Sequence, residues 1–78
     1  MNTFDRLVKV FKAVFDEDVN LDALSPEADL RADVGMNSIG MLYMAMALEE
    51  EFEVKFTNED FVSISKVSDV IACIEGKL

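Results

Sequence analysis

Hydrophobic residues recur every three or four positions in the first part of the chain, the spacing that places them on one face of a helix. This pattern predicts an amphipathic helix over about residues 3 to 16, with Asn2 or Thr3 available to cap its first amide groups. We expect this helix to pack on a core through one face, which carries Phe4, Leu7, Val8, Phe11, Val14 and Phe15.

Helical spacing is absent between Asp16 and about Met36, where turn-forming residues gather. About twenty residues without regular structure are unusual in a small domain, and such loops are generally functional. We expect four hydrophobic side chains to hold this loop against the core, namely Leu21, Leu24, Leu30 and Val34.

Residues 39 to 52 are rich in Met, Ala, Leu and Glu, which predicts a second helix. This helix carries two hydrophobic stripes. The stripe expected to face the core contains Met41, Met44, Ala45, Leu48 and Phe52. The other stripe contains Ile39, Leu42 and Met46 and continues into Glu49, Glu50 and Glu53. It is either an exposed docking surface bordered by carboxylates or a surface that the long loop covers, and the spacing favours neither interpretation.

Two shorter helices are predicted in the last third of the chain. Thr57 can accept the amide of Asp60, which is typical of the start of a short helix running to about residue 64. Ser65 is expected to cap a last helix that ends near Gly76 and buries Val67, Val70, Ile71 and Ile74.

Sustained strand alternation is absent from the sequence, which favours an all-α fold. We predict a small four-helix bundle with a long loop between the first two helices and a short third helix. Chains of 78 residues rarely divide into two cores, so residues 1–78 should form a single domain.

The charge balance limits the possible partners. The chain has 16 acidic and 7 basic residues, a formal net charge of −9. Nucleic acid and anionic membrane surfaces should repel it, so we expect neither as a partner. Thirteen of the acidic residues fall between positions 16 and 60, which favours partners with basic surfaces.

The residue types that are missing narrow the chemistry. The chain contains no His, which removes the commonest general base and metal ligand. Its single Cys cannot form an internal disulfide, so a reduced, cytoplasmic setting is the simplest expectation. We also expect the chain to be a monomer. The longest uncharged run, residues 34–48, is too short to span a bilayer.

Ser38 stands directly before the predicted second helix, after a glycine-containing turn. Its hydroxyl could be a simple helix cap. It could also be a point of phosphate attachment, because the free amides and the positive dipole end of a helix favour phosphate oxygens. The spacing does not choose between these two roles.

Four segments around this position have recognisable sequences: LSPEADL at residues 24–30, DVGMNSI at 33–39, ALEEEF at 47–52 and KVSDVI at 66–71. Together they resemble the acyl carrier protein family. The resemblance implies a four-helix bundle in which Ser38 carries 4′-phosphopantetheine donated by coenzyme A.

The same resemblance implies a carrier without catalytic activity of its own. It would hold acyl groups as thioesters for fatty acid, polyketide or related lipid biosynthesis. Its partners would be a phosphopantetheinyl transferase and acyl-transferring, condensing or ligase enzymes with basic docking surfaces. The surface expected to bind them comprises Ile39, Leu42, Tyr43, Met46, Glu49 and Glu50.

Four positions depart from the family pattern. Asn37 stands where the family has Asp before the serine, and Ile39 replaces the usual Leu. Neutral Gly40 and Tyr43 occupy positions in the first two turns that are usually acidic. These departures indicate a specialised carrier that serves a dedicated pathway.

Two other interpretations compete with the carrier. Asp16, Asp18, Asn20, Asp22 and Glu27 have the spacing of an EF-hand calcium loop. However, Leu21 stands where that loop needs glycine, and Pro26 falls inside it. The other alternative is an unmodified acidic adaptor that binds a basic partner through the second helix, with Ser38 serving only as a cap.

Overall fold

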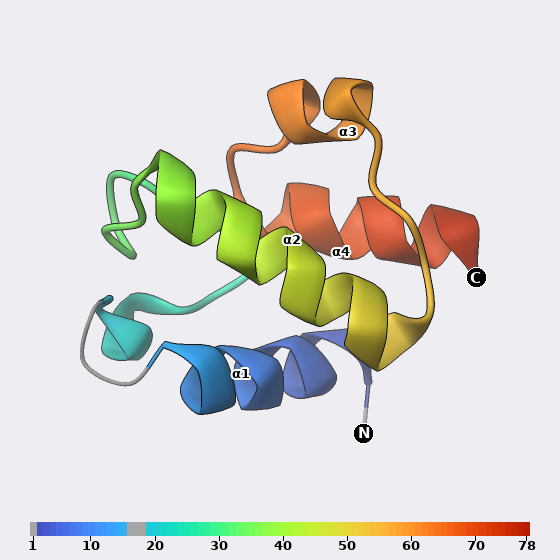
Figure 1. Ribbon diagram of the computed structural model, residues 1–78. Helices are drawn as coiled ribbons and strands as arrows, with labels where there is room; N and C mark the ends of the chain where they lie inside the picture. The colour runs from blue at the N-terminus through green and yellow to red at the C-terminus, as the bar shows by residue number, and fades with distance from the viewer. Residues whose placement is uncertain (1, 16–18) are drawn as a thin grey trace.

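The computed structural model describes residues 2–15 and 19–78 (Figure 1). This part of the chain forms four α-helices and contains no strand. The predicted all-α, four-helix architecture is confirmed. The helices are α1 (Thr3–Val14), α2 (Ser38–Phe52), α3 (Asn58–Ser63) and α4 (Val67–Lys77), and one 3-10 turn, η1 (Leu21–Ala23), lies in the first connection.

Helix α1 begins as the sequence predicted, because the Asn2 side chain accepts the Asp5 amide at 2.8 Å. It ends at Val14, earlier than the predicted end at residue 16, which lies outside the described residues. The backbone becomes extended at Phe15. Phe15 is buried, and its ring packs edge-on against Phe11 with 5.5 Å between the centroids. Phe15, directly after α1, is therefore part of the core, whereas the expectation that Val14 packs there is wrong, because Val14 is 41% exposed.

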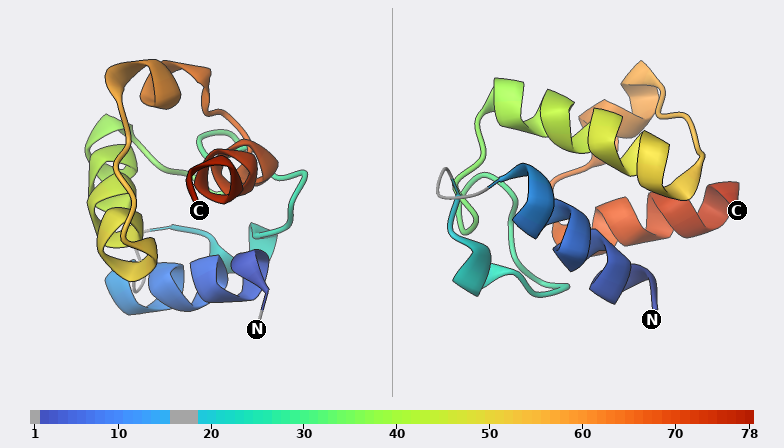
Figure 2. Two further views of the ribbon diagram at one scale, coloured as in Figure 1. Left: turned by 90° about the vertical axis from the view of Figure 1, so that its right-hand side faces the viewer. Right: turned by 60° about the horizontal axis from the view of Figure 1, so that its bottom comes forward.

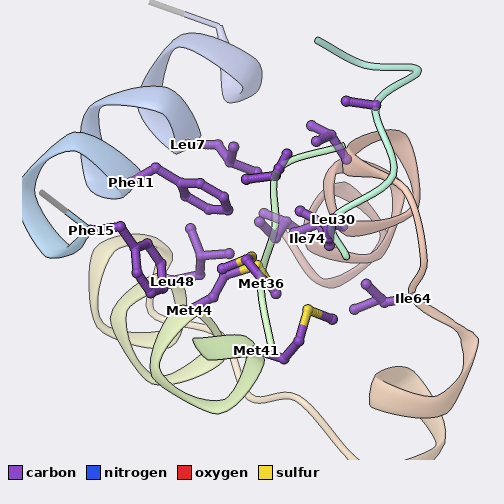
Figure 3. Close-up of a cluster of buried hydrophobic side chains, with 14 of the residues drawn as sticks. Leu7, Phe11, Phe15, Leu30, Met36, Met41, Met44, Leu48, Ile64 and Ile74 are labelled. Carbon is purple, nitrogen blue, oxygen red and sulfur yellow. The ribbon is translucent and has the colours of Figure 1, made fainter. Parts of the chain in front are cut away.

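The core lies between α1, α2 and α4, as Figure 3 shows. Helix α2 buries the stripe that its spacing predicted, comprising Met41, Met44, Ala45, Leu48 and Phe52. Helix α4 contributes Val67, Val70 and Ile74 to the core. Ile71, which was also predicted to be buried, is only half-buried at the edge of the core. These side chains leave water together, and apolar burial on this scale is the main stabilising contribution to a domain of this size.

The first connection is held to the core by its leucines, as expected. Leu30 and Val34 are fully buried, while Leu21 and Leu24 pack partly against the core. Backbone hydrogen bonds join the loop to the start of α4: the Leu30 amide donates to Ser65 O, and the Val67 amide donates to Ala28 O. The two segments therefore run side by side (Figure 2), which fixes the loop that leads into α2.

Caps define the two shorter helices. At α3, Thr57 accepts the Asp60 amide and the Asp60 carboxylate accepts the Thr57 amide, which confirms the predicted capping box. At α4, the prediction that Ser65 is the cap is wrong. Lys66 occupies that position, and the carboxylate of Asp69 accepts the amides of both Ser65 and Lys66. The Ser65 hydroxyl bonds the same carboxylate instead of capping the helix.

Candidate functional site

Ser38 is the first residue of α2, not the residue before it. The N-cap is Asn37, whose side-chain oxygen accepts the Gly40 amide at 2.7 Å. The interpretation of Ser38 as the cap is therefore wrong. Ser38 is exposed, and because Asn37 supplies the cap, its hydroxyl is not needed to stabilise the helix.

The turn before α2 holds Ser38 at the surface. Gly35 adopts a positive φ of 88°, a conformation that glycine enters without steric cost. The next residue, Met36, is buried, and its amide donates to Leu30 O at 2.9 Å. One buried anchor and one sharp turn thus place the hydroxyl of Ser38 at the start of the helix.

The start of α2 suits a phosphate ester. The first turn of the helix contains no acidic residue that would repel a phosphate. Asn37 binds the amides of Gly40 and Met41, through its side chain and its carbonyl oxygen respectively. The amides of the first turn and the helix dipole favour negative charge at Ser38. The residues present therefore fit an attached phosphate.

A cavity of about 300 Å³ is lined by the two chain neighbours of Ser38, Asn37 and Ile39, although not by Ser38 itself. It lies where the end of α1 and the turn at Gly35 meet the first two turns of α2. Its walls include Phe15, Met36, Asn37, Ile39, Gly40 and Tyr43. The family resemblance implies a cavity between helices, but the sequence does not assign its lining residues, because Phe15 is far from α2 along the chain and only the fold brings them together.

The second stripe of α2 is exposed. Ile39, Leu42, Tyr43 and Met46 each leave between 55% and 65% of their surface accessible. The alternative in which the long loop covers this stripe is therefore wrong for these side chains. We call these four residues the apolar strip of α2. The strip begins immediately after Ser38, so a protein that contacts its first residue, Ile39, also lies close to the hydroxyl.

The glutamates that border the strip differ in their surroundings. Glu50 and Glu53 are exposed, as a docking surface requires. Glu49 is half-buried, and its carboxylate accepts the Phe56 amide at 2.7 Å. One oxygen of Glu49 therefore holds the connection between α2 and α3 in place. Its predicted role in docking would have to use the other oxygen.

The structure does not support the EF-hand interpretation. Asp16 and Asp18 lie outside the described residues. An EF-hand loop leads directly into a second helix, but the described residues from Glu27 to Asn37 form turns and no helix. Within the described ranges, no group of three or more acidic or cysteine side chains is placed to hold a metal.

Comparison with known proteins identifies the family. Residues 5–74 match the family described as the phosphopantetheine attachment site. The chain is 36% identical over 70 residues to an acyl carrier protein of Nitratidesulfovibrio vulgaris, an alignment covering 88% of this chain and 92% of the relative. It is 37% identical over 71 residues to an acyl carrier protein of Helicobacter pylori, covering 88% and 91%.

The chain therefore belongs to the acyl carrier protein family, which confirms the predicted family. It is a carrier of acyl groups on covalently attached 4′-phosphopantetheine. This assignment explains a chain without histidine, since the cofactor supplies the reactive thiol and the protein supplies attachment and orientation. No helix in the described residues is long and apolar enough to cross a membrane.

Proposed function

We propose that 4′-phosphopantetheine is attached to the hydroxyl of Ser38. The observation that carries this proposal is an exposed serine at the first position of α2 whose capping role is filled by Asn37. Attachment forms one phosphate ester bond to Ser38 Oγ, displaces the nucleotide part of coenzyme A and passes the hydroxyl proton to a base of the transferase. The dipole of α2 then stabilises the phosphate charge.

The partner enzymes would bind along α2. The apolar strip offers hydrophobic contact next to Ser38, and the exposed carboxylates of Glu50 and Glu53 offer charge at the other end of the helix. A partner that fits both would present an apolar hollow flanked by basic residues. Such a partner would be an acyl-transferring, condensing or ligase enzyme, with the carrier acting as a monomer in the cytoplasm and performing no catalysis itself.

Intact mass tests the attachment site. The protein is incubated with coenzyme A, magnesium and a broad-specificity phosphopantetheinyl transferase. We expect the mass to increase by one phosphopantetheine group in the native chain and to remain unchanged in Ser38→Ala. Ser63→Ala is a matched control, since Ser63 is also exposed but ends α3.

Two results would contradict the proposal. A native chain that never gains the adduct would favour the unmodified adaptor. A Ser38→Ala variant that still gains it would place the attachment elsewhere. The new thiol can be distinguished from Cys73, because burial and the nearby Asp60 carboxylate raise the pKa of the Cys73 thiol and leave it less reactive than an exposed thiol.

A further inference from the structure

No described part of the chain fills the cavity near Ser38, so the cavity can receive a ligand. The residues on either side of Ser38, Asn37 and Ile39, both contribute to its walls. Its volume of about 300 Å³ is at the lower end of the range for ligand pockets. Ser38 itself is not among the lining residues, so a group tethered to it has to turn past Asn37 or Ile39 to enter the cavity. A short segment of that group is enough to fill it.

The cavity exists partly because residue 40 has no side chain. A Cβ atom at Gly40 would lie 3.3 Å from Asn37 Oδ1, 3.7 Å from Met36 Cβ and 3.8 Å from Phe15 Cε1. All three of these residues line the cavity. Glycine in a helix costs up to about 1 kcal/mol relative to alanine, and at this position its absent side chain leaves room between α2 and Phe15.

The walls combine apolar and hydrogen-bonding groups. Phe15, Met36 and Ile39 provide apolar surface, while Asn37 has an amide and Tyr43 a hydroxyl. Because the oxygen of the Asn37 amide accepts the Gly40 amide, its NH₂ group remains as a donor. The segment of 4′-phosphopantetheine next to its phosphate has the same mixture, with a carbon bearing two methyl groups followed by a hydroxyl and an amide.

We propose that this cavity seats the dimethyl segment of the 4′-phosphopantetheine arm, between α2 and the end of α1. This inference rests on the proposed attachment at Ser38. The tether keeps the segment at a high effective concentration beside the cavity, so weak contacts are sufficient to hold it. Seating there fixes the direction in which the arm leaves α2, before any acyl group is attached.

Nuclear magnetic resonance of the modified protein tests the proposal. The arm carries ¹³C in its two methyl groups, and intact mass first establishes that every sample is modified. We expect nuclear Overhauser effects from these methyl groups to the rings of Phe15 and Tyr43. Gly40→Leu should abolish them by filling the cavity. Gly76→Leu is the control, since a Cβ at Gly76 in α4 meets nothing within 4 Å.

Each outcome is decisive. Modified protein without these contacts, or with equal contacts in Gly40→Leu, overturns the seating of the arm. Contacts that arise only after acylation also overturn it and make the cavity an acyl site. A chain that gains no mass contradicts the attachment at Ser38 itself. Amide spectra show whether Gly40→Leu is folded, and Gly40→Ala gives a smaller insertion in which the contacts should weaken.

Discussion

Asn37 is the residue on which the geometry around Ser38 depends. From the sequence, Asn37 is notable only because the family pattern has aspartate at this position. In the structure it caps α2, because its side chain accepts the Gly40 amide. A close reading of spacing could have found this role, since asparagine is among the best N-cap residues. The signal was missed because the neighbouring serine is an equally good cap.

Asn37→Ala should therefore lower the free energy of unfolding by about 1 kcal/mol. Asn37→Asp should leave it nearly unchanged, since a carboxylate also caps and interacts favourably with the helix dipole. Chemical denaturation of the three proteins provides the measurement. Equal stability of the native chain and Asn37→Ala would show that Asn37 does not hold the start of α2.

The same aspartate substitution should alter the modification of Ser38. A carboxylate beside the hydroxyl restores the residue type that the family pattern has before the serine. We expect a standard magnesium-dependent transferase to modify Asn37→Asp faster than the native chain, as followed by intact mass against time. An unchanged or slower rate would mean that Asn37 does not limit recognition by that enzyme.

Among the elements, α2 shows both what spacing predicts and what it leaves open. Its buried stripe follows directly from the helical period, because a face with apolar residues at every turn has to leave water. Whether the other stripe is covered depends on the path of the first loop. That path is fixed by the hydrogen bonds between residues 28–30 and the start of α4, and no local pattern encodes them.

The apolar strip can be tested separately from the fold. Leu42→Ser should weaken binding to an acyl-handling partner while the melting temperature changes little, because Leu42 is more than half exposed. Surface plasmon resonance with the modified carrier would measure the affinity. Val62→Ser is the control, since Val62 is 88% exposed but belongs to α3. Equal losses in both variants would show that the strip has no special role.

Helices α1 and α2 are also joined at their surface. The Arg6 guanidinium bonds the Glu51 carboxylate at 3.1 Å and lies 4.3 Å from the centre of the Phe52 ring. Arg6→Ala should lower the unfolding free energy by roughly 1 kcal/mol, through the lost ion pair and ring contact. Arg6→Lys should restore only part of it, because an ammonium group lacks the planar fork. Chemical denaturation of both variants measures the unfolding free energies. If Arg6→Lys had the full stability of the native chain, the effect would come from charge alone.

At the scale of the whole molecule, stability in acid depends on a few aspartates that accept backbone amides. Asp60 and Asp69 do so at the starts of α3 and α4, and Asp29 does so in a turn of the first connection. The backbone amides of Ala32 and Arg31 lower the pKa of Asp29 by donating hydrogen bonds to its carboxylate. Those of Lys66 and Ser65 lower the pKa of Asp69 in the same way. For Asp60, the Thr57 amide and the Lys77 ammonium lower the pKa to about 2. Each carboxylate stabilises the fold while it is ionised, and each therefore makes the fold sensitive to acid.

The sign of the pH dependence follows from these depressed values. A carboxyl group with a lower pKa in the folded state contributes its full stability above the unfolded value, which for aspartate is 3.8, and loses it as the pH falls through the folded value. The melting temperature of the native chain should therefore fall between about pH 4 and pH 2. The change of melting temperature with pH should be smaller in Asp60→Asn, because an amide side chain does not titrate in this pH range.

Asp60 is suited to this test because it connects two parts of the molecule. Its carboxylate accepts the Thr57 amide at the start of α3 and the Lys77 ammonium at the end of α4, at 2.9 Å in each case. Glu59→Gln removes an exposed carboxylate one position earlier, so it controls for the change in net charge. Calorimetry from pH 2 to pH 6 should show a reduced slope in Asp60→Asn alone. Equal slopes in the two variants would mean that acid acts through total charge and not through the joint between α3 and α4.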